Sequence, residues 1–430
     1  MVDKNSIEIL RKKYLPPSLR LSYSSPLHIV KGDGQYLYDE KGRQYLDAVN
    51  NIQHVGHCHP TVIKAAQNQF EKLNTNTRYL DETIVHYAAA LSKKLPKKLD
   101  VCFFTNSGSE SNDLALRIAR TISDSKETIV LDGAYHGNLS SMIEISPYKH
   151  NGPGGSGAPE YVHTVTMPDK FRGKYRGKDS GQKYINEVMM IIDEIHSSNK
   201  VVSAFIVESL MGCGGQVVLP DGFLKDAFQI VREAGGICIT DEVQIGFGRM
   251  GTHFWGFETQ DVIPDIVTMG KSMGNGHPLS AVVTTKEIVD KFNTGMEYFN
   301  SFGGNPVSCA VGHAVLDVIE KEHLQKNALD VGHYLKNLLE KLKIDYDIIG
   351  DVRGHGLFLG IELVRSHRSL EPADKEAHQI VNAMKEMGVL ISADGPYHNV
   401  LKIKPPMVFT RDNALFLVET LENALLLTNK

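Results

Sequence analysis

The chain has 430 residues, a formal net charge of −5 and 42% hydrophobic residues, values that are ordinary for a globular protein of two or three domains. The mildly acidic balance gives no electrostatic basis for binding nucleic acid. No stretch approaches the roughly 20 apolar residues that cross a bilayer, and no signal peptide is evident at the N-terminus. Five scattered cysteines without a C-x-x-C pair argue against a disulfide framework or a metal site. We therefore expect a cytoplasmic protein with no nucleic-acid, membrane or metal partner.

Alternating apolar residues on both sides of a Lys41-Gly42 turn predict a β-hairpin over residues 34–47. From about residue 60 onward, short apolar runs alternate with helix-length segments. The expected strands are 101–105, 128–131, 201–208, 236–240 and 265–268, and the helices include 111–122 and 183–197. This alternation is typical of an α/β domain whose mostly parallel sheet is covered by helices on both faces.

Near residue 320 the pattern changes. A helical stretch to Leu342 is followed by a strand pair within 346–363, a helix around 374–387, and a closing strand and helix. We predict an N-terminal segment and hairpin over 1–59 that belongs to a small domain, a large domain over 60–320, and a C-terminal small α+β domain over 321–430.

The strongest local signal is a buried strand that ends in Gly270-Lys271 and runs into a Gly-rich turn. Desolvation at the end of a buried strand lowers the pKa of a lysine and makes its amine nucleophilic. An ordinary surface lysine is one alternative. A P-loop is another, but Asp265 stands where the first glycine of that motif is required.

A second apolar strand ends in Asp241, which alone reads as a helix cap or a loop residue. Together, Asp241 and Lys271 match the needs of pyridoxal phosphate, which takes a lysine for its Schiff base and an acid for its ring nitrogen. The segment Thr105–Asn112 joins a strand to a helix, so its backbone N–H groups and serines could bind a phosphate. Tyr135 supplies a ring that could stack on the cofactor, although such a turn and such an aromatic also occur for structural reasons alone.

These motifs, in this order and spacing, resemble the class III aminotransferase family of fold-type I pyridoxal-phosphate enzymes, from Gly32 to Pro406. The shared motifs begin at Ser107 (SGSESN), Tyr135 (YHG), Asp241 (DEVQ), Lys271 and Gly303 (GGNP). The resemblance implies a large domain with a mostly parallel seven-stranded-type sheet and a smaller α+β domain.

The resemblance also implies roles for individual residues. Lys271 would hold the cofactor and act as the catalytic base, Asp241 would face the ring nitrogen, and Gln244 would bond the ring hydroxyl. The implied cofactor-binding set is Ser107, Gly108, Ser109, Tyr135, His136, Glu208, Asp241, Gln244, Lys271 and Ser301. Ser301 matches a family threonine that reaches the phosphate in the neighbouring subunit, which implies a homodimer with shared active sites.

Within the family, the chain is most similar to phospho-lyases that act on ethanolamine phosphate or 5-phosphohydroxylysine. Asn138 and Lys402 stand where typical members carry arginines that clamp substrate carboxylates. Arginine binds a carboxylate with a planar fork, whereas lysine is a point charge and asparagine is neutral. Both departures disfavour a dicarboxylate acceptor such as 2-oxoglutarate.

The expected reaction is elimination of phosphate from a small amine that carries a phosphate ester on the neighbouring carbon, giving aldehyde, ammonia and phosphate. The alternative is an ω-aminotransferase that passes an amino group to a keto acid. A basic loop over 170–178 could close over the substrate phosphate or be a solvated turn. The candidate substrate residues are Asn50, His54, Asn138, Arg172, Arg176 and Lys402.

Overall fold

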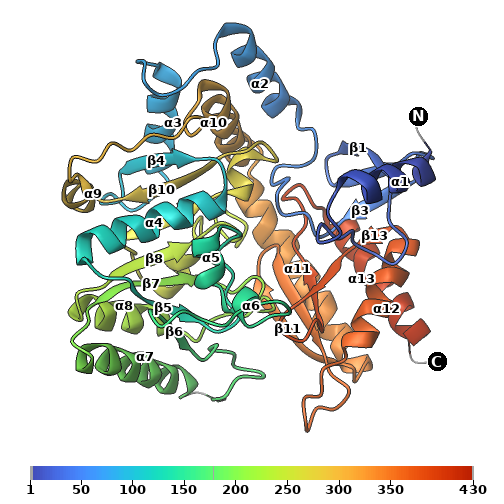
Figure 1. The fold of residues 1–430 in the computed structure, drawn as a ribbon. Helices are drawn as coiled ribbons and strands as arrows, with labels where there is room; N and C mark the ends of the chain where they lie inside the picture. Colours follow the sequence, from blue (N-terminus) through green and yellow to red (C-terminus); the bar gives the residue numbers. More distant parts are fainter. Residues whose placement is uncertain (1–2, 178, 429–430) are drawn as a thin grey trace.

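The computed structural model describes residues 3–177 and 179–428, arranged around a large sheet and two smaller ones (Figure 1). The large sheet has seven strands in the order β4-β10-β9-β8-β7-β5-β6. Its strands are β4 (Val101–Thr105), β5 (Glu127–Leu131), β6 (Val162–Val165), β7 (Val202–Glu208), β8 (Ile237–Asp241), β9 (Ile266–Met269) and β10 (Ser280–Thr284). Only β10 runs antiparallel to its neighbours, so the expected mostly parallel sheet is confirmed.

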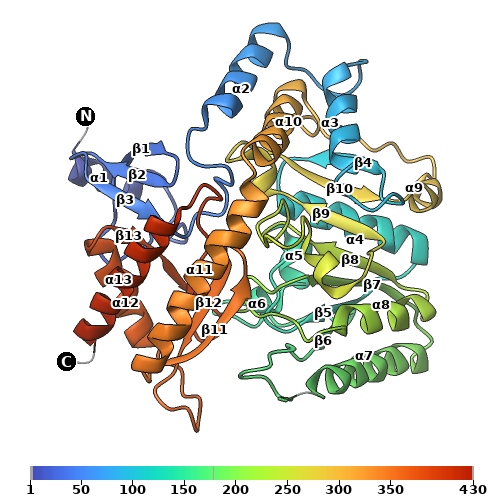
Figure 2. The same ribbon diagram turned by 180° about the vertical axis from the view of Figure 1, so that it is seen from behind.

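Helices cover both faces of this sheet, as Figures 1 and 2 show from opposite sides. Along β7, Ala204 and Ile206 pack with α4 (Gly108–Ser123) on one face. Phe205 and Val207 point the other way, toward α7 (Ser180–Ser197) and α8 (Phe223–Glu233). Alternation of side chains along a strand explains why an unbroken apolar run serves both faces.

The remaining helices connect the strands or cover their edges. They are α1 (Lys4–Tyr14), α2 (Pro60–Lys72), α3 (Glu82–Ser92), α5 (Ser140–Glu144), α6 (Pro147–His150), α9 (Lys286–Phe292), η1 (Gly256–Gln260) and η2 (Lys271–Gly274). None of the helices in the described residues is long and apolar enough to cross a membrane.

The N-terminal hairpin lies beside the C-terminal part of the chain. The strands β1 (Ile29–Asp33), β2 (Tyr36–Asp39) and β3 (Gln44–Asp47) form a sheet with β13 (Val389–Leu390), and β3 pairs with β13 in parallel. The hairpin itself is therefore confirmed. Its pairing with β13 supports our proposal that residues 1–59 and 321–430 form one small domain.

The third sheet has the order β11-β12-β15-β14 and includes the expected strand pair. Its strands are β11 (Ile349–His355), β12 (Phe358–Leu363), β14 (Ser392–Asp394) and β15 (Val400–Ile403), and the helices α12 (Asp374–Glu386) and α13 (Arg411–Thr428) pack nearby. The helical stretch to Leu342 is two helices, α10 (Pro306–Lys321) and α11 (Leu324–Asp345). They are separated because His323 adopts a left-handed conformation, with φ of 53°.

The large sheet places the predicted site residues at one edge. Glu208 and Asp241 end the parallel strands β7 and β8, and Lys271 follows β9 by two residues. The carboxyl ends of parallel strands meet at the same edge, where open α/β sheets bind their ligands. The turn from β4 into α4 reaches that edge as well.

Candidate active site

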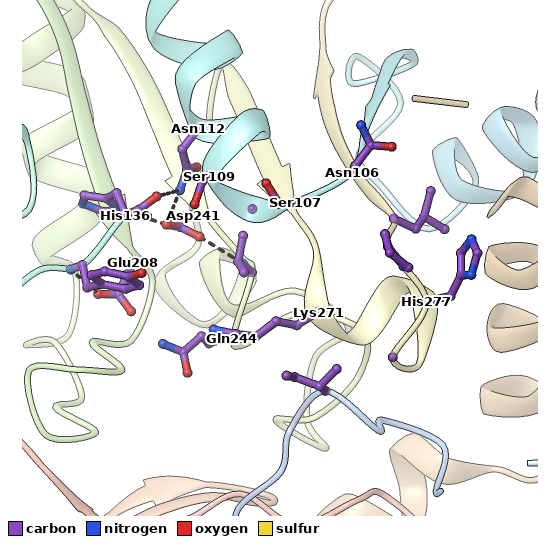
Figure 3. A pocket seen from close by; sticks show the side chains of 18 residues that line it. Asn106, Ser107, Ser109, Asn112, His136, Glu208, Asp241, Gln244, Lys271 and His277 are labelled. Carbon is purple, nitrogen blue, oxygen red and sulfur yellow. Dashed lines mark hydrogen bonds and ion pairs between the residues drawn. The ribbon is translucent and has the colours of Figure 1, made fainter. Parts of the chain in front are cut away.

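A cavity of about 360 Å³ lies at this edge of the sheet (Figure 3). Nine of the ten predicted cofactor residues line it: Ser107, Gly108, Ser109, Tyr135, His136, Glu208, Asp241, Gln244 and Lys271. The residues that sequence analysis did not assign to the cavity include Asn106, Asn112, Val243 and the turn 276–279.

Lys271 begins the short helix η2 and extends into the cavity (Figure 3). Its φ of 35° is in the left-handed region, which is uncommon for a residue with a side chain. Among the described residues, Lys271 Nζ has no hydrogen-bond or ion-pair partner, and burial lowers its pKa. Both facts favour the neutral, nucleophilic amine.

Asp241 is held by two neighbouring side chains. Its Oδ2 accepts hydrogen bonds from His136 Nδ1 at 2.9 Å and from Asn112 Nδ2 at 2.7 Å. Its Oδ1 accepts from the backbone N–H of Val243 at 3.1 Å. Asn112 is fixed in turn, because its Oδ1 accepts from Thr268 Oγ1 at 2.5 Å. These donors orient a charged carboxylate toward the cavity.

The start of α4 forms a small polar cradle. Ser107 is its N-cap, and its Oγ accepts from the backbone N–H of Glu110 at 3.2 Å. Gly137 lies so close that a Cβ there would come within 2.6 Å of Ser109 Oγ, and its φ of 143° also favours glycine. A helix N-terminus with a serine hydroxyl and a close backbone suits a phosphate group.

Glu208 anchors the loop that carries Tyr135. Its carboxylate accepts from the backbone N–H of Tyr135 at 3.3 Å and of Gly212 at 2.9 Å. Burial, with the nearby charge of Asp241, raises the pKa of Glu208 to about 7. Glu208 therefore positions the Tyr135 backbone as well as facing the cavity.

Gln244 connects the cavity to a buried lysine that sequence analysis missed. Gln244 Oε1 accepts from Lys404 Nζ at 3.2 Å and from Asn51 Nδ2 at 3.4 Å. The available signal for Lys404 was its spacing from Lys402, since residues two apart on a strand share a face. Asn112 gave a similar signal, because it lies three residues after Ser109 on a helix.

None of the six candidate substrate residues lines the cavity. His54 is fully buried, its Nε2 donates to the Phe247 carbonyl at 2.7 Å, and its Nδ1 is 3.1 Å from Arg249 Nη2. Burial, with the charge of Arg249, lowers the pKa of His54 to about 3. The structure thus gives His54 a packing role and leaves it no face toward a substrate. Asn50 belongs to a turn, where its backbone N–H donates to Asp47 Oδ1 at 2.9 Å.

The basic loop does not lie over the cavity either. Arg172 is bonded to Glu362 and to the Leu370 carbonyl. The other partners are Asp221 for Lys170 at 3.3 Å, Glu187 for Lys174 at 2.7 Å and the Gly173 carbonyl for Arg176 at 3.4 Å. Three of these four cations therefore pair with carboxylates of the same chain, which corrects the interpretation of the loop as a set of free charges.

Two departures from the family pattern lie close to the cavity without lining it. The Asn138 backbone N–H donates to Ser109 Oγ at 3.0 Å. Lys402 Nζ lies 3.2 Å from Asp394 Oδ2 on the adjacent strand. Ser301 is exposed, on a segment whose predicted role requires a second subunit.

Together these groups fit one cofactor. A buried lysine, a fixed carboxylate, an aromatic ring and a phosphate cradle are the four parts that pyridoxal phosphate requires of a protein. No group of three or more side chains that could hold a metal ion occurs among residues 3–177 and 179–428.

Comparison with known proteins agrees with this fit. The family described as aminotransferase class-III matches residues 20–425. Alanine--glyoxylate aminotransferase 2-like of Drosophila melanogaster is 51% identical over 94% of this chain and 84% of its own. Ethanolamine-phosphate phospho-lyase homolog 1 of Caenorhabditis elegans is 41% identical over 100% and 95%. The structure of an Arthrobacter phospholyase in complex with phosphoethanolamine is similar at a TM-score of 0.93, with 40% identity, over 98% of this chain and 99% of that one.

Proposed function

Since the chain belongs to the class III aminotransferase family, whose cofactor is pyridoxal 5′-phosphate, we propose that it is a phospho-lyase acting on a vicinal amino-phosphate. The proposed substrate is phosphoethanolamine or 5-phosphohydroxylysine, and the products are an aldehyde, ammonia and phosphate. The observation that carries the proposal is the kind of charge near the cavity. No arginine of the described residues lines it, and the nearby cations on the small-domain side are lysines.

This charge arrangement suits a phosphate better than two carboxylates. Lys402 and Lys404 alternate with the buried Leu401 and Ile403, so both lysines point to the same side of β15. Lysine is a common ligand of phosphate, whereas bidentate recognition of a carboxylate depends on arginine. The Arthrobacter phospholyase, whose title includes phosphoethanolamine, supports the same choice.

The residues of the cavity would divide the work as follows. Bound pyridoxal phosphate supplies an electron sink for the charge left when a proton leaves the carbon next to the substrate nitrogen. Lys271 Nζ is the base that takes this proton. Asp241 keeps a positive charge on the ring nitrogen. The C–O bond then breaks, phosphate leaves with the bonding electrons, and water releases ammonia and the aldehyde.

An ω-aminotransferase is the second candidate, and the name of the Drosophila relative favours it. Both reactions begin with removal of the same proton by Lys271. They differ in the next step, because transamination returns a proton to the cofactor and requires a keto acid as acceptor.

The test separates these reactions by their products. The loaded enzyme is incubated with phosphoethanolamine, with 5-phosphohydroxylysine, and with a simple amine plus 2-oxoglutarate. We expect inorganic phosphate and an aldehyde in equal amounts from one of the first two mixtures, and no glutamate from the third. Glutamate formation without phosphate release would replace the proposal with an aminotransferase.

We also propose that the protein is a homodimer whose subunits complete each other's sites. Apolar side chains are exposed on two adjacent segments, after α2 and before α10: Phe70, Leu73, Tyr79, Leu80, Met296, Phe299 and Phe302. The segments are linked, because Arg78 lies 3.1 Å from Glu297 and over the Phe299 ring. An exposed apolar patch of this kind is typical of an interface, and Ser301 lies within it.

We expect Leu80→Asp to weaken this dimer at least about a hundredfold, because an interface leucine contributes about 1.5–3 kcal/mol and a buried charge adds a further cost. Analytical ultracentrifugation measures the change as a shift from dimer to monomer mass. Ile344→Asp, which changes an exposed residue on α11, is the matched control and should remain dimeric. A parent protein that sediments as a monomer would contradict the proposal.

A further inference from the structure

Lys404 is a buried lysine without a carboxylate partner. Its exposed fraction is 0%, and no carboxylate oxygen of the described residues lies within ion-pair distance of its Nζ. The Nζ donates to Gln244 Oε1 at 3.2 Å and lies 4.0 Å from the centroid of the Phe358 ring. Burying an ammonium group with so few partners is costly, so its position calls for a reason beyond packing.

The backbone around Lys404 is fixed from both sides. The Lys404 N–H donates to the Ala48 carbonyl at 2.8 Å, and Arg249 Nη1 donates to the Pro405 carbonyl at 2.7 Å. Arg249 is itself fully buried. The lysine side chain is therefore held against Gln244.

This contact decides which end of the Gln244 amide is available to the cavity. Oε1 already accepts from Lys404 and, at 3.4 Å, from Asn51. The contact recorded for Nε2 is weak, to Cys213 Sγ at 4.0 Å. Gln244 lines the cavity, so its Nε2 can act there only as a hydrogen-bond donor.

We propose that Lys404 is a positioning residue that holds Gln244 as a donor to the ring oxygen of pyridoxal phosphate and places a positive charge behind that contact. The resemblance to the family suggests the ring oxygen as the partner of Gln244, and the contact with Lys404 explains how the amide is oriented. This inference rests on the cofactor, which both candidate reactions require, and not on the choice between them.

The charge of Lys404 acts on a crowded set of groups. Lys402, Asp394, Cys213 and Lys271 surround it, and burial together with Lys402 lowers its pKa to about 7. Glu208, Asp241, Cys213 and Lys402 act on Lys271. A cation near Lys271 disfavours a proton on the nitrogen there, and a donor to the ring oxygen stabilises negative charge on that oxygen. Removing both raises the pH at which the nitrogen loses its proton.

The test is a pH titration of the visible absorption band of the enzyme loaded with pyridoxal phosphate. We expect Lys404→Met to raise the midpoint by about one pH unit, the size of shift that a nearby charge produces. Lys404→Gln keeps a donor for Gln244 without the charge and should give a smaller rise. Lys385→Met is the control, since Lys385 is also buried but lies on α12, where its Nζ bonds Ser25 and Glu386.

Melting temperature and cofactor content are measured on the same samples. A raised midpoint in Lys404→Met, with an unchanged midpoint in Lys385→Met, supports the inference. An unchanged midpoint in a folded, loaded Lys404→Met overturns it. If Lys404→Met does not fold, Lys404→Gln decides: a rise supports the inference and no rise overturns it. A raised midpoint in a protein that releases no phosphate would leave Lys404 in this role and reject only the phospho-lyase proposal.

Discussion

Lys271→Ala is expected to lower turnover about ten-thousandfold or more, because the same amine anchors the cofactor and moves the proton. The visible band that arises from the bond between the lysine and pyridoxal phosphate should disappear as well. Product assays and an absorption spectrum of the purified variant measure the two effects. Lys286→Ala is the control, because that side chain is exposed and pairs only with Asp290. A Lys271→Ala variant with normal turnover would require another base.

Asp241→Asn is expected to keep the fold and lower turnover about a thousandfold. Asparagine still accepts a hydrogen bond from His136 or Asn112, but it has no charge to balance a protonated ring nitrogen. Losing one partner of a buried ion pair costs about 3–5 kcal/mol, and every 1.4 kcal/mol is a factor of ten in rate.

The comparison for this variant is Asp265→Asn, which breaks the ion pair with Arg232 at the opposite end of the sheet. We expect that change to lower the melting temperature and leave turnover nearly unchanged. Steady-state kinetics and thermal melts on both variants separate chemistry from stability. A near-normal rate for Asp241→Asn would make Asp241 a structural residue only.

The sequence was most informative where local patterns determine structure. Continuous apolar runs identified β4, β5, β7, β8 and β9, and the alternation around Lys41-Gly42 identified the hairpin. The residues that end those strands were predicted to share a site, and the parallel sheet brings Asp241 and Lys271 to one cavity. Two short strands, β6 and β10, were missed, since runs of four or five residues carry little pattern.

Long-range partners could not be predicted. Arg172 reads as a free charge in a basic loop, but Glu362, its partner, lies 190 positions away in the sequence. His54 likewise gains its role from Phe247 and Arg249. Lys404 was overlooked because nothing local indicates that a lysine two residues beyond Lys402 would be fully buried beside Gln244. In each case the partner is set by the tertiary fold.

The pairing of β3 with β13 has a consequence for synthesis on the ribosome. All seven strands of the large sheet lie between Val101 and Thr284, so this sheet can form while the C-terminal part is still being translated. The hairpin emerges first but must wait for Val389 and Leu390, among the last segments to appear. Until then the edge of β3 that β13 will cover is unpaired, and such an edge can pair with another chain. Nascent chains of this protein should therefore depend on chaperones most strongly after the large sheet has formed and before β13 emerges.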